Sequence, residues 1–384
     1  MKMKILHCCL SSIYVDGYGY LENILPRYNK ADGHEVKILA STEVYINNQK
    51  LGYVAPGSHV DDAGIEITRL PYRRFLPHKI MRKLRYYQGV TKFLEQFQPD
   101  VILYHGISGH GMVEVADYCS THPSTKLYID SHASFANSGR NFLSKNIQHK
   151  ILGRCWMGKA LPLAEMILPI SLECYPFLRE LYKIPDANME LFPLGGEILS
   201  SEEHQSLRKS LRQELGFSDD DIVLIHTGKM NSNKNTSILL DALLRTKETS
   251  AIKLIMVGSA CDEVKAKIDD AAQRDSRIRY LGWLSGDRLR QLFHAADIYM
   301  QPGSASASFQ QALCAGCAGA ARSAHSYPEF FGNAFWPIDS TEDIVKLLQS
   351  IAANPELLVY KKRESFAFAK ENLDYAILAS RIYR

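Results

Sequence analysis

The sequence has no run of about 18 apolar residues, so we expect no membrane-spanning helix. It contains neither the Walker pattern of P-loop nucleotide hydrolases nor the GxGxxG fingerprint of dinucleotide-binding domains. No DxD triplet follows a strand-like segment, because Asp219, Asp220 and Asp221 precede one and are typical of a solvated turn. The two common phosphate-binding loops are therefore excluded, and we predict no metal site.

The cysteines give no sign of a disulfide framework or of a zinc site. Eight are scattered along the chain, and the opening MKMKILHCCL is too short to be a secretion signal, so we predict a protein of the reducing cytoplasm. Cys314 and Cys317 have CxxC spacing but no second pair, so we expect them to pack a helix. His105 and His110 lie in a glycine-rich loop with no third ligand.

The composition is that of an ordinary globular protein. The chain has 384 residues, of which 46% are hydrophobic and 23% charged, with a net charge of +3. This length predicts two or three domains, each able to bury a core. Short apolar runs alternate with helical patterns, such as those over Tyr18–Asp32 and Ile80–Phe97.

These apolar runs form two series. The predicted strands are Lys4–Cys8, Glu35–Ala40, Ile65–Arg69, Val101–Tyr104, Lys126–Ile129 and Met166–Pro169, then Ile222–Thr227, Lys253–Val257, Ile278–Leu281 and Ile298–Gln301, with weaker candidates near Ala318 and Phe335. The alternation predicts an α/β protein with parallel, doubly wound sheets. A polar stretch, Leu199–Arg212, separates the series. We therefore predict two Rossmann-like domains facing one another across a cleft, over residues 1–190 and 191–363, followed by a helix over 364–384.

The turn after Ile222–Thr227 is the strongest functional signal. It contains Gly228, Lys229 and Lys234, and a helical pattern opens at Asn235. Backbone N–H groups at a helix start favour anions, and lysine side chains neutralise charge on a leaving phosphate without a metal. The turn therefore predicts a diphosphate site, although an ordinary loop with surface lysines has the same pattern.

A basic stretch lies over Arg69–Lys92. No acidic residue interrupts it, and aromatic and aliphatic residues are interleaved with its lysines and arginines. This mixture suits the surface of an anionic membrane. A solvated helix face is the alternative, and no nucleic-acid-binding motif accompanies the charge, so we expect no nucleic-acid partner.

Several short motifs occur in a fixed order along nearly the whole chain. They are Asp16–Asn23 (DGYGYLEN), Leu25-Pro26, Gly33–Val36 (GHEV), Asp130-Ser131-His132, Thr227–Lys234, Leu281-Gly282-Trp283, Ala295-Ala296-Asp297 and Pro302–Gly316. In this order the chain resembles the retaining, family 4-like glycosyltransferases of the GT-B fold, above all those that build bacterial O-antigen and capsule polysaccharide. The resemblance implies that the last helix crosses back to the first domain.

The resemblance also implies roles for individual residues. Lys229 and Lys234 would stabilise the leaving diphosphate, and His132 would contact the donor sugar. Residues of the donor-binding domain would hold the nucleotide-sugar, and residues of the acceptor-binding domain would hold the acceptor. The donor-side residues are Gly228, Lys229, Lys234, Ser306, Ser308, Gln310 and Gln311; the acceptor-side residues are Asp16, Gly17, Gly19, Asn137 and Arg140.

One departure from the family pattern affects the donor loop. Many members have two glutamates seven residues apart, whereas here Gln311 stands at the second position and Gly303 or a nearby serine at the first. Glutamine can accept a hydrogen bond from a ribose hydroxyl but carries no charge.

We therefore expect a metal-independent glycosyltransferase with no cofactor beyond its nucleotide-sugar co-substrate. It would act with retention of configuration on a glycan acceptor, for which we expect a lipid-linked glycan, and we expect it in the cytoplasm at the inner face of the cytoplasmic membrane. Two alternatives remain: a non-catalytic glycosyltransferase-like subunit that binds a glycan or a partner, which the missing glutamates favour, and a nucleotide-sugar epimerase, which shares the architecture but needs carboxylates in the segment Gly303–Gly316.

Overall fold

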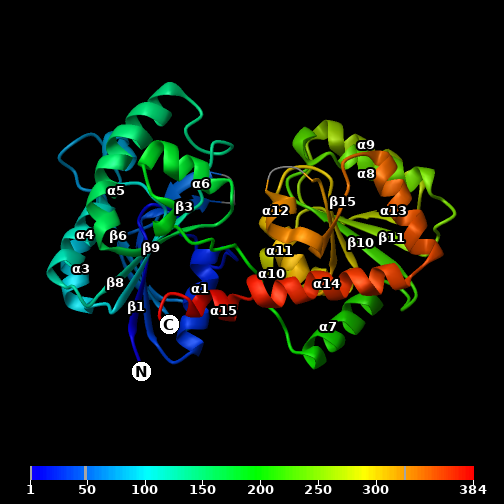
Figure 1. Cartoon of the computed structure of the whole chain (residues 1–384), viewed down its shortest axis with the longest axis horizontal. Helices are drawn as coiled ribbons and strands as arrows, with labels where there is room; N and C mark the ends of the chain where they lie inside the picture. The colour runs from blue at the N-terminus through cyan, green and yellow to red at the C-terminus, as the bar shows by residue number, and fades with distance from the viewer. Residues whose placement is uncertain (1, 47–49, 324–325) are drawn as a thin grey trace. The chain divides into compact units, whose positions relative to one another are not determined.

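The computed structural model describes residues 2–46, 50–323 and 326–384. The chain divides into two compact units. Unit 1 comprises Met1–Pro193 with Ala376–Arg384, and unit 2 comprises Leu194–Tyr375. Each unit is a sheet covered by helices (Figure 1), so each has a core of its own.

Unit 1 is built on a seven-stranded sheet with the order β5-β6-β2-β1-β7-β8-β9. All neighbours are parallel except β5 and β6. The strands, including the separate hairpin β3–β4, are β1 (Lys4–Cys9), β2 (Glu35–Ser41), β3 (Glu43–Ile46), β4 (Lys50–Tyr53), β5 (Gly57–Val60), β6 (Glu66–Leu70), β7 (Val101–His105), β8 (Lys126–Ser131) and β9 (Ala164–Pro169). The helices are α1 (Leu21–Ala31), α2 (His78–Leu84), α3 (Val90–Phe97), α4 (Gly111–Thr121), the π-helical η1 (Leu143–Gly153), α5 (Arg154–Ala160), α6 (Cys174–Phe177), η3 (Leu178–Tyr182) and α15 (Tyr375–Ser380).

Unit 2 has a six-stranded, wholly parallel sheet with the order β12-β11-β10-β13-β14-β15. Its strands are β10 (Ile222–Thr227), β11 (Ile252–Val257), β12 (Ile278–Tyr280), β13 (Ile298–Gln301), β14 (Ala318–Ala321) and β15 (Phe335–Pro337). Its helices are α7 (Ser201–Glu214), the 3₁₀ turn η5 (Ser232–Lys234), α8 (Thr236–Arg245), α9 (Asp262–Arg274), α10 (Gly286–Ala295), α11 (Ala307–Cys314), α12 (Tyr327–Phe331), α13 (Thr341–Ala353) and α14 (Glu356–Asn372).

Both sheets confirm the prediction of two Rossmann-like domains. In each sheet the strand order reverses beside the first strand, between β1 and β7 in unit 1 and between β10 and β13 in unit 2. Ligands in open α/β sheets bind outside the carboxyl ends of the strands at such a reversal. The loops after these four strands are therefore the candidate binding loops.

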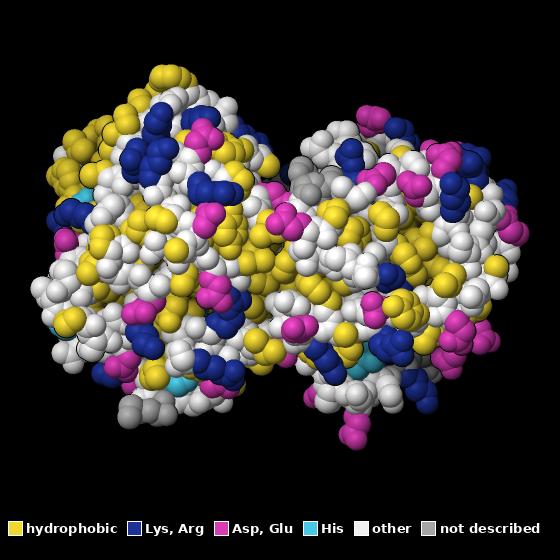
Figure 2. Space-filling view, viewed as in Figure 1, with side chains coloured by type: hydrophobic (Ala, Val, Ile, Leu, Met, Phe, Trp, Pro, Cys, Tyr) yellow, Lys and Arg dark blue, Asp and Glu magenta, His cyan; other side chains and the backbone are white. Residues whose placement is uncertain are grey.

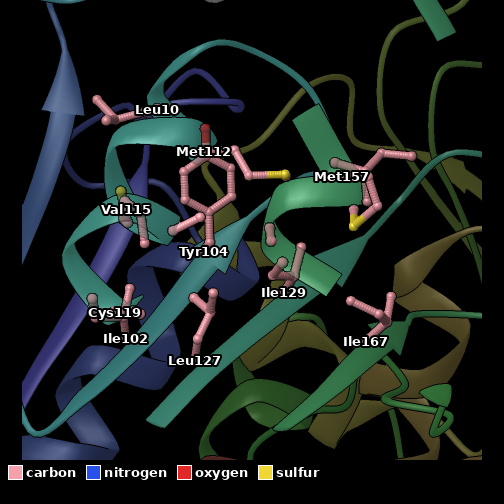
Figure 3. Close-up of a cluster of buried hydrophobic side chains, with 14 of the residues drawn as sticks. Leu10, Ile102, Tyr104, Met112, Val115, Cys119, Leu127, Ile129, Met157 and Ile167 are labelled. Atoms are coloured by element: carbon pink, nitrogen blue, oxygen red, sulfur yellow. The ribbon is translucent and has the colours of Figure 1, made fainter. Parts of the chain in front are cut away.

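The core of each unit follows from its nearly continuous apolar strands. In unit 1, Tyr104, Ile129 and Ile167 from neighbouring strands pack with Met112 of α4 and Met157 of α5 (Figure 3). These side chains are all buried. In unit 2, two separate clusters cover the two faces of the sheet. A sheet buried on both faces holds the ends of its strands rigidly, which is what a binding site requires.

The sequence pattern missed three strands and merged two helices. β3, β4 and β5 are four residues each, and β5 is exposed along its length, so no apolar periodicity marks them. The single helix predicted over Ile80–Phe97 is wrong: α2 ends at Leu84, and Arg85 adopts a left-handed φ of 50°. The chain leaves the helix so that Tyr87 can enter the core, where its hydroxyl donates to the carbonyl oxygen of Leu10 at 2.8 Å.

The end of the chain also differs from the single helix predicted over residues 364–384. The helix α14 begins earlier, at Glu356, and ends at Asn372. Gly196 then exchanges backbone hydrogen bonds with Leu373 and Tyr375 within unit 2. From Ala376 onward the chain belongs to unit 1, where the carbonyl oxygen of Ala379 accepts a 3.0 Å hydrogen bond from Asn29. No helix among the described residues is long and apolar enough to cross a bilayer.

Candidate functional site

In unit 2, the loops after β10 and β13 are joined at the point where the strand order reverses. The Lys234 ammonium donates a 2.9 Å hydrogen bond to the carbonyl oxygen of Ser304. The Ser304 N–H donates to the Asn233 carbonyl oxygen at 2.9 Å, and the Asn235 side chain donates to the Pro302 carbonyl oxygen at 3.1 Å. The two loops therefore form one rigid surface at the carboxyl edge of the sheet.

Glycine is required where these loops approach one another. A Cβ atom on Gly303 would lie 2.3 Å from the Asn233 carbonyl oxygen. Gly228 has φ +130°, and a Cβ atom on Gly258, in the loop after β11, would lie 1.9 Å from the Gly228 carbonyl oxygen. A side chain at Gly303 or Gly258 would overlap the neighbouring backbone, and Gly228 and Gly258 also have a positive φ that favours glycine. The loops after β10, β11 and β13 are thus held in close backbone contact at this edge.

The two predicted phosphate-binding lysines have different environments. Lys234 is buried, with 8% of its surface exposed, and burial lowers the pKa of its ammonium group. Lys229 is exposed, and among the described residues it has no hydrogen-bond or ion-pair partner. Lys234 therefore helps to hold the loops together and its charge is only partly solvated. Lys229, by contrast, is available to an incoming anion.

The predicted donor residues of the loop after β13 fall into two groups. Ser306 belongs to a chain of hydrogen bonds between neutral side chains. Its hydroxyl donates to the Gln301 side chain at 2.9 Å and lies 3.2 Å from the Tyr299 hydroxyl. The Tyr299 hydroxyl in turn lies 2.8 Å from the Thr227 hydroxyl. Burial raises the pKa of the Tyr299 hydroxyl, and Ser308, which lies near it, contributes to the environment that opposes this effect. This group connects the ends of β10 and β13.

The two glutamines of α11 face another part of unit 2. The Gln310 side chain accepts a 2.9 Å hydrogen bond from the Gly195 N–H, and Gln311 hydrogen-bonds Tyr375. Both side chains thus fix segments that lead into and out of unit 2. No acidic residue occurs between Gly303 and Gly316, so the neutral amide of Gln311 stands where the family pattern has its second glutamate.

Unit 1 contains a cavity of about 370 Å³ at the corresponding edge of its sheet. Its walls come from the loops after β1, β7 and β8, from α1 and from η1. The lining residues include Ser11, Ser12, Glu22, His105, Ser108, Asp130, His132, Asn137, Ser138 and His149. Hydroxyl, imidazole and carboxylate groups dominate this list, which suits a ligand rich in hydroxyl groups.

His132 and Asp130 form the polar centre of this cavity. The His132 Nε2 atom lies 3.7 Å from Oδ1 of Asp130, a fully buried carboxylate. Burial opposes protonation of His132, but the negative charge of Asp130 outweighs it and raises the pKa of the imidazole. The other Asp130 oxygen lies 2.5 Å from Nδ1 of His105. His132 is thus a cavity residue whose charged form Asp130 stabilises.

The acceptor loop predicted over Asp16 to Gly19 lies outside the residues that line the cavity. The Asp16 carboxylate is bound by Arg69 at 2.8 Å and by His59 at 3.0 Å. The Arg69 guanidinium is buried and also donates to the carbonyl oxygens of Tyr14 and Ser41. Asp16 therefore anchors its loop, while Gly17, with φ +74°, provides the turn. The part of this loop that reaches the cavity is Ser11 and Ser12.

Asn137 and Arg140 both shape the loop after β8. The Asn137 side chain donates to the His132 carbonyl oxygen at 2.8 Å and accepts from the Ser134 N–H at 2.9 Å. The Arg140 guanidinium donates to the Ala136 carbonyl oxygen at 2.6 Å, and this residue is exposed and outside the cavity lining. Asn137 therefore supports His132 and borders the cavity.

The sequence pattern did not identify His105 or Glu22 as cavity residues, and it quoted Asp130 only as part of a motif. A usable signal was present: His105 ends β7 and Asp130 stands near the end of β8, and the two are register partners. Polar residues at the ends of adjacent parallel strands meet at one edge of a sheet. Within the described ranges, no group of three or more His, Cys, Asp or Glu residues has the arrangement of a metal site.

Comparison with known proteins identifies the fold and one domain. Residues 208–370 match the family model described as glycosyl transferases group 1. A lipopolysaccharide 1,2-N-acetylglucosaminetransferase of Salmonella typhimurium is 26% identical over 229 residues, which are 54% of this chain and 58% of that relative. The glycosyltransferase-like protein EpsD of Bacillus subtilis is 20% identical over 78% of this chain and 72% of its own length.

Solved structures resemble the chain over nearly its full length. WaaG, a glycosyltransferase involved in lipopolysaccharide biosynthesis, has a TM-score of 0.62 at 15% identity over 99% of both chains. Anabaena HepE in complex with UDP has a TM-score of 0.61 at 15% identity, over 100% of this chain and 98% of its own. A glycosyltransferase from Rickettsia africae has a TM-score of 0.65 at 14% identity, over 99% of this chain and 96% of its own.

The sheet order of both units and these full-length structural matches give the chain the GT-B fold of glycosyltransferases. The family match covers the segment that contains the joined loops after β10 and β13. Residues 208–370 therefore resemble the domain described by the group 1 glycosyl transferase model.

Proposed function

We propose that this chain transfers a sugar from a nucleoside diphosphate sugar to a hydroxyl group of a glycan, with retention of configuration and without a bound metal. The observation that carries the proposal is the loop pair of unit 2, in which Gly228, Lys229 and Lys234 stand at the reversal of strand order. The resemblance to group 1 glycosyl transferases over the same residues supports it.

The lysines fit the chemistry of a departing diphosphate. Negative charge grows on the phosphate oxygens as the glycosidic bond breaks, so fixed cations stabilise the transition state more than the ground state. Lys234 is already ordered by Ser304, and its charge is weakly solvated because it is buried. Lys229 completes the site from the exposed side of the turn, and the two ammonium groups take the role that a divalent cation has in other transferases.

The cavity of unit 1 supplies groups for the sugar and the acceptor. A protonated His132 donates a hydrogen bond to a sugar hydroxyl, while Ser11, Ser12 and Glu22 line the same cavity. In the retaining reaction, the acceptor hydroxyl attacks the oxocarbenium-like sugar from the face that the diphosphate leaves. The leaving diphosphate accepts the proton of the acceptor hydroxyl, so the protein needs no carboxylate nucleophile.

A lipid-linked glycan on the inner face of the cytoplasmic membrane is the acceptor class that we propose. The Salmonella relative is named for lipopolysaccharide, which supports a role in O-antigen or capsule assembly. In the basic stretch Arg69–Lys92, carboxylates of unit 1 bind several cations: Arg69 pairs with Asp16, Arg73 with Glu114 and Arg85 with Glu43. Phe75, Leu76 and Ile80 of this stretch are exposed, and they remain available for a membrane.

A second basic and apolar surface of unit 1 strengthens the membrane proposal. Residues 131–164 contain five lysines and arginines and no acidic residue. Phe142, Leu143, Ile147 and Ile151, along η1, are 42–74% exposed. Hydrophobic side chains lie beside lysine and arginine side chains at this end of unit 1, at the upper left of Figure 2. Apolar side chains with flanking cations favour an anionic lipid surface.

A non-catalytic, glycan-binding subunit is the second candidate function, and one observation favours it. The donor loop has no carboxylate from Gly303 to Gly316, so a charge-assisted bond to the donor is missing. Such a subunit would bind glycans in the cavity of unit 1 and would not turn over a nucleotide-sugar.

The test is a thermal-shift and calorimetric screen of the purified chain against UDP, GDP, ADP, CMP and dTDP, with and without EDTA. A ligand that binds only the native state raises the melting temperature. We expect one nucleoside diphosphate to bind selectively and equally in EDTA. No binding of any of these nucleotides would contradict the transferase and favour the glycan-binding subunit.

A further inference from the structure

A line of fully buried polar groups leads from His132 into the core of unit 1. His105, His7 and Asn29 follow Asp130 in this line, and each has 1% or less of its surface exposed. They come from β7, β1 and α1, and the imidazole rings of His7 and His105 are stacked with centroids 5.3 Å apart. Three polar side chains buried behind a binding cavity are costly unless each hydrogen bond has a defined donor and acceptor.

The hydrogen bonds assign the protons along this line, starting from Asn29. The Asn29 amide nitrogen donates to the Ala379 carbonyl oxygen at 3.0 Å, which fixes the orientation of the amide. The Asn29 oxygen, 2.7 Å from Nε2 of His7, must then accept a proton from that nitrogen. Burial and the neighbouring His105 lower the pKa of His7 to about 3, so His7 is neutral and its Nδ1 has no proton.

The next link determines the charge of His105. Nδ1 of His7 lies 3.1 Å from Nε2 of His105, so His105 must donate through Nε2. On its other side, Nδ1 of His105 lies 2.5 Å from Oδ2 of Asp130. Burial opposes the ionisation of Asp130, but His105 and His132 outweigh it and hold the pKa of this carboxyl well below its usual range. A carboxylate only accepts, so His105 also donates through Nδ1.

We propose that His105 carries a fixed positive charge, and that His7, Asn29 and His105 are positioning residues that hold the Asp130 carboxylate for His132. With one Asp130 oxygen bound to His105, the other is directed toward His132 and toward the Gly106 N–H, which donates to it at 2.8 Å. Asp130 thus faces two cations. Its orientation depends on groups as distant in sequence as Ala379.

Among the described residues, Glu22, His149 and Cys9 are further titratable groups near His132 and Asp130, and they do not alter the assignment. Glu22 of α1 borders the cavity and favours protonation of His132. His149 of η1 is bonded to Tyr182, and burial lowers the pKa of its imidazole. Cys9 of β1 remains a neutral thiol, because burial raises its pKa well above the usual value. None of the three carries a positive charge that would replace the one on His105.

The direct test is an NMR spectrum of protein labelled with ¹⁵N-histidine, in which correlations to the ring protons report the state of each nitrogen. We expect both nitrogens of His105 to carry a proton, as the hydrogen-bond geometry requires, and His7 to carry its only ring proton on Nε2. An unprotonated nitrogen on His105 would overturn the proposal. This measurement requires neither donor nor acceptor, so it is independent of the proposed transferase function.

Two variants test the charge and the geometry separately. In His105→Gln, Asp130 faces one cation instead of two, so the pKa of His132 rises by about one unit or more; an unchanged pKa would show that His105 was neutral. In His7→Gln, the new amide can accept a hydrogen bond from His105 and donate one to Asn29, so the His105 ring signals should remain as in the wild type. In His7→Leu neither hydrogen bond can form, so the His105 ring signals should change. His122→Gln, at the half-buried C-terminal end of α4, is the control that leaves the pKa of His132 unchanged.

A turnover measurement adds a readout that rests on the proposed function. With the nucleotide-sugar identified by the screen, the pH at which activity falls on the alkaline side shifts upward in His105→Gln and remains in place in His7→Gln. If the spectra agree with the assignment but neither the wild type nor any variant turns over a donor, the positioning roles of His7, Asn29 and His105 are supported and the transferase function is contradicted. If turnover occurs and its pH profile is the same in all variants, His105 has only a structural role.

Discussion

The ammonium group of Lys234 donates a 2.9 Å hydrogen bond to the carbonyl oxygen of Ser304, and this bond joins the two loops at the strand-order reversal of unit 2. The cation that the sequence assigns to a phosphate is therefore also a structural element of the donor loop. Lys229, five residues earlier, is exposed and has no partner among the described residues. The roles of the two lysines should separate in experiment.

Lys229→Ala should weaken the binding of the nucleoside diphosphate by tenfold or more without a change in stability, because one charge-assisted hydrogen bond is worth about 1.5–3 kcal/mol. Lys234→Ala should lower both the affinity and the free energy of unfolding. Calorimetry and urea denaturation measure the two quantities. Lys267→Ala, on the exposed face of α9, is the matched control and should leave both unchanged. Wild-type affinity in Lys229→Ala would remove this lysine from the site.

Gly258→Ala should destabilise the chain by about 1–3 kcal/mol or more, because the new methyl group would overlap the Gly228 carbonyl oxygen. It should also weaken nucleotide binding, since the turn that contains Lys229 would move. Gly158→Ala is the control: this helical glycine in α5 has open space around it and should stabilise by roughly 0.5–1 kcal/mol. Equal melting temperatures for the two variants would contradict the close approach of the loops.

Asp297→Asn should cost about 3 kcal/mol or more, because three cations around this buried carboxylate would lose their partner. Asp297 contacts Arg208 at 2.6 Å, Lys362 at 2.9 Å and Arg212 at 3.2 Å. Burial alone would raise the pKa of Asp297, but Lys362 and Arg208 lower it from 3.8 to about 2. A folded-state pKa below the unfolded one adds stability above about pH 4, and this stability is lost as the pH falls toward 2.

Urea denaturation at a series of pH values checks this linkage. The wild type should lose stability between pH 4 and pH 2 more steeply than Asp297→Asn. The control Asp287→Asn replaces an exposed carboxylate and should change stability by less than about 0.5 kcal/mol. Parallel curves for wild type and Asp297→Asn would show that the carboxylate is not held by its cations.

Ile151→Glu should reduce the binding of the chain to vesicles that contain anionic lipid, because it removes an apolar contact and adds a repelled charge. Flotation with vesicles of phosphatidylglycerol and phosphatidylcholine measures the effect. Val359→Glu is matched in exposure, since both side chains belong to residues that are 60% exposed, and it should have no effect. Ile80→Glu tests the stretch Arg69–Lys92 in the same way. Equal binding of all three variants would contradict membrane contact by unit 1.

Most of the fold was predictable, because the two sheets are parallel and their strands are continuous apolar runs. Even the weak candidates near Ala318 and Phe335 are strands. The errors occur where tertiary packing outweighs local pattern. The stretch Ile80–Phe97 has helical periodicity, but Tyr87 leaves the helix to hydrogen-bond Leu10 in the core. The exposed strand β5 has no apolar pattern at all.

The candidate site was predictable in part. The turn of Lys229 and Lys234 and the cavity residue His132 could be found because each follows a strand. That Lys234 is buried could not be predicted, since it depends on the loop after β13, about 70 residues later in the chain, where the Ser304 carbonyl oxygen accepts its hydrogen bond. The assignment of His105 also needed structure, because its protonation follows from His7 and Asn29, which lie on other elements.

The most direct measurement is transfer itself. The purified chain is incubated in EDTA with the nucleotide-sugar whose diphosphate it binds and with a lipid extract of the source cells, and the product is examined by mass spectrometry and by NMR of the anomeric proton. We predict a lipid-linked glycan one sugar longer, with the anomeric configuration of the donor, and no product in Lys229→Ala. Binding of the diphosphate without transfer to any acceptor fraction would contradict the transferase and identify a glycan-binding subunit.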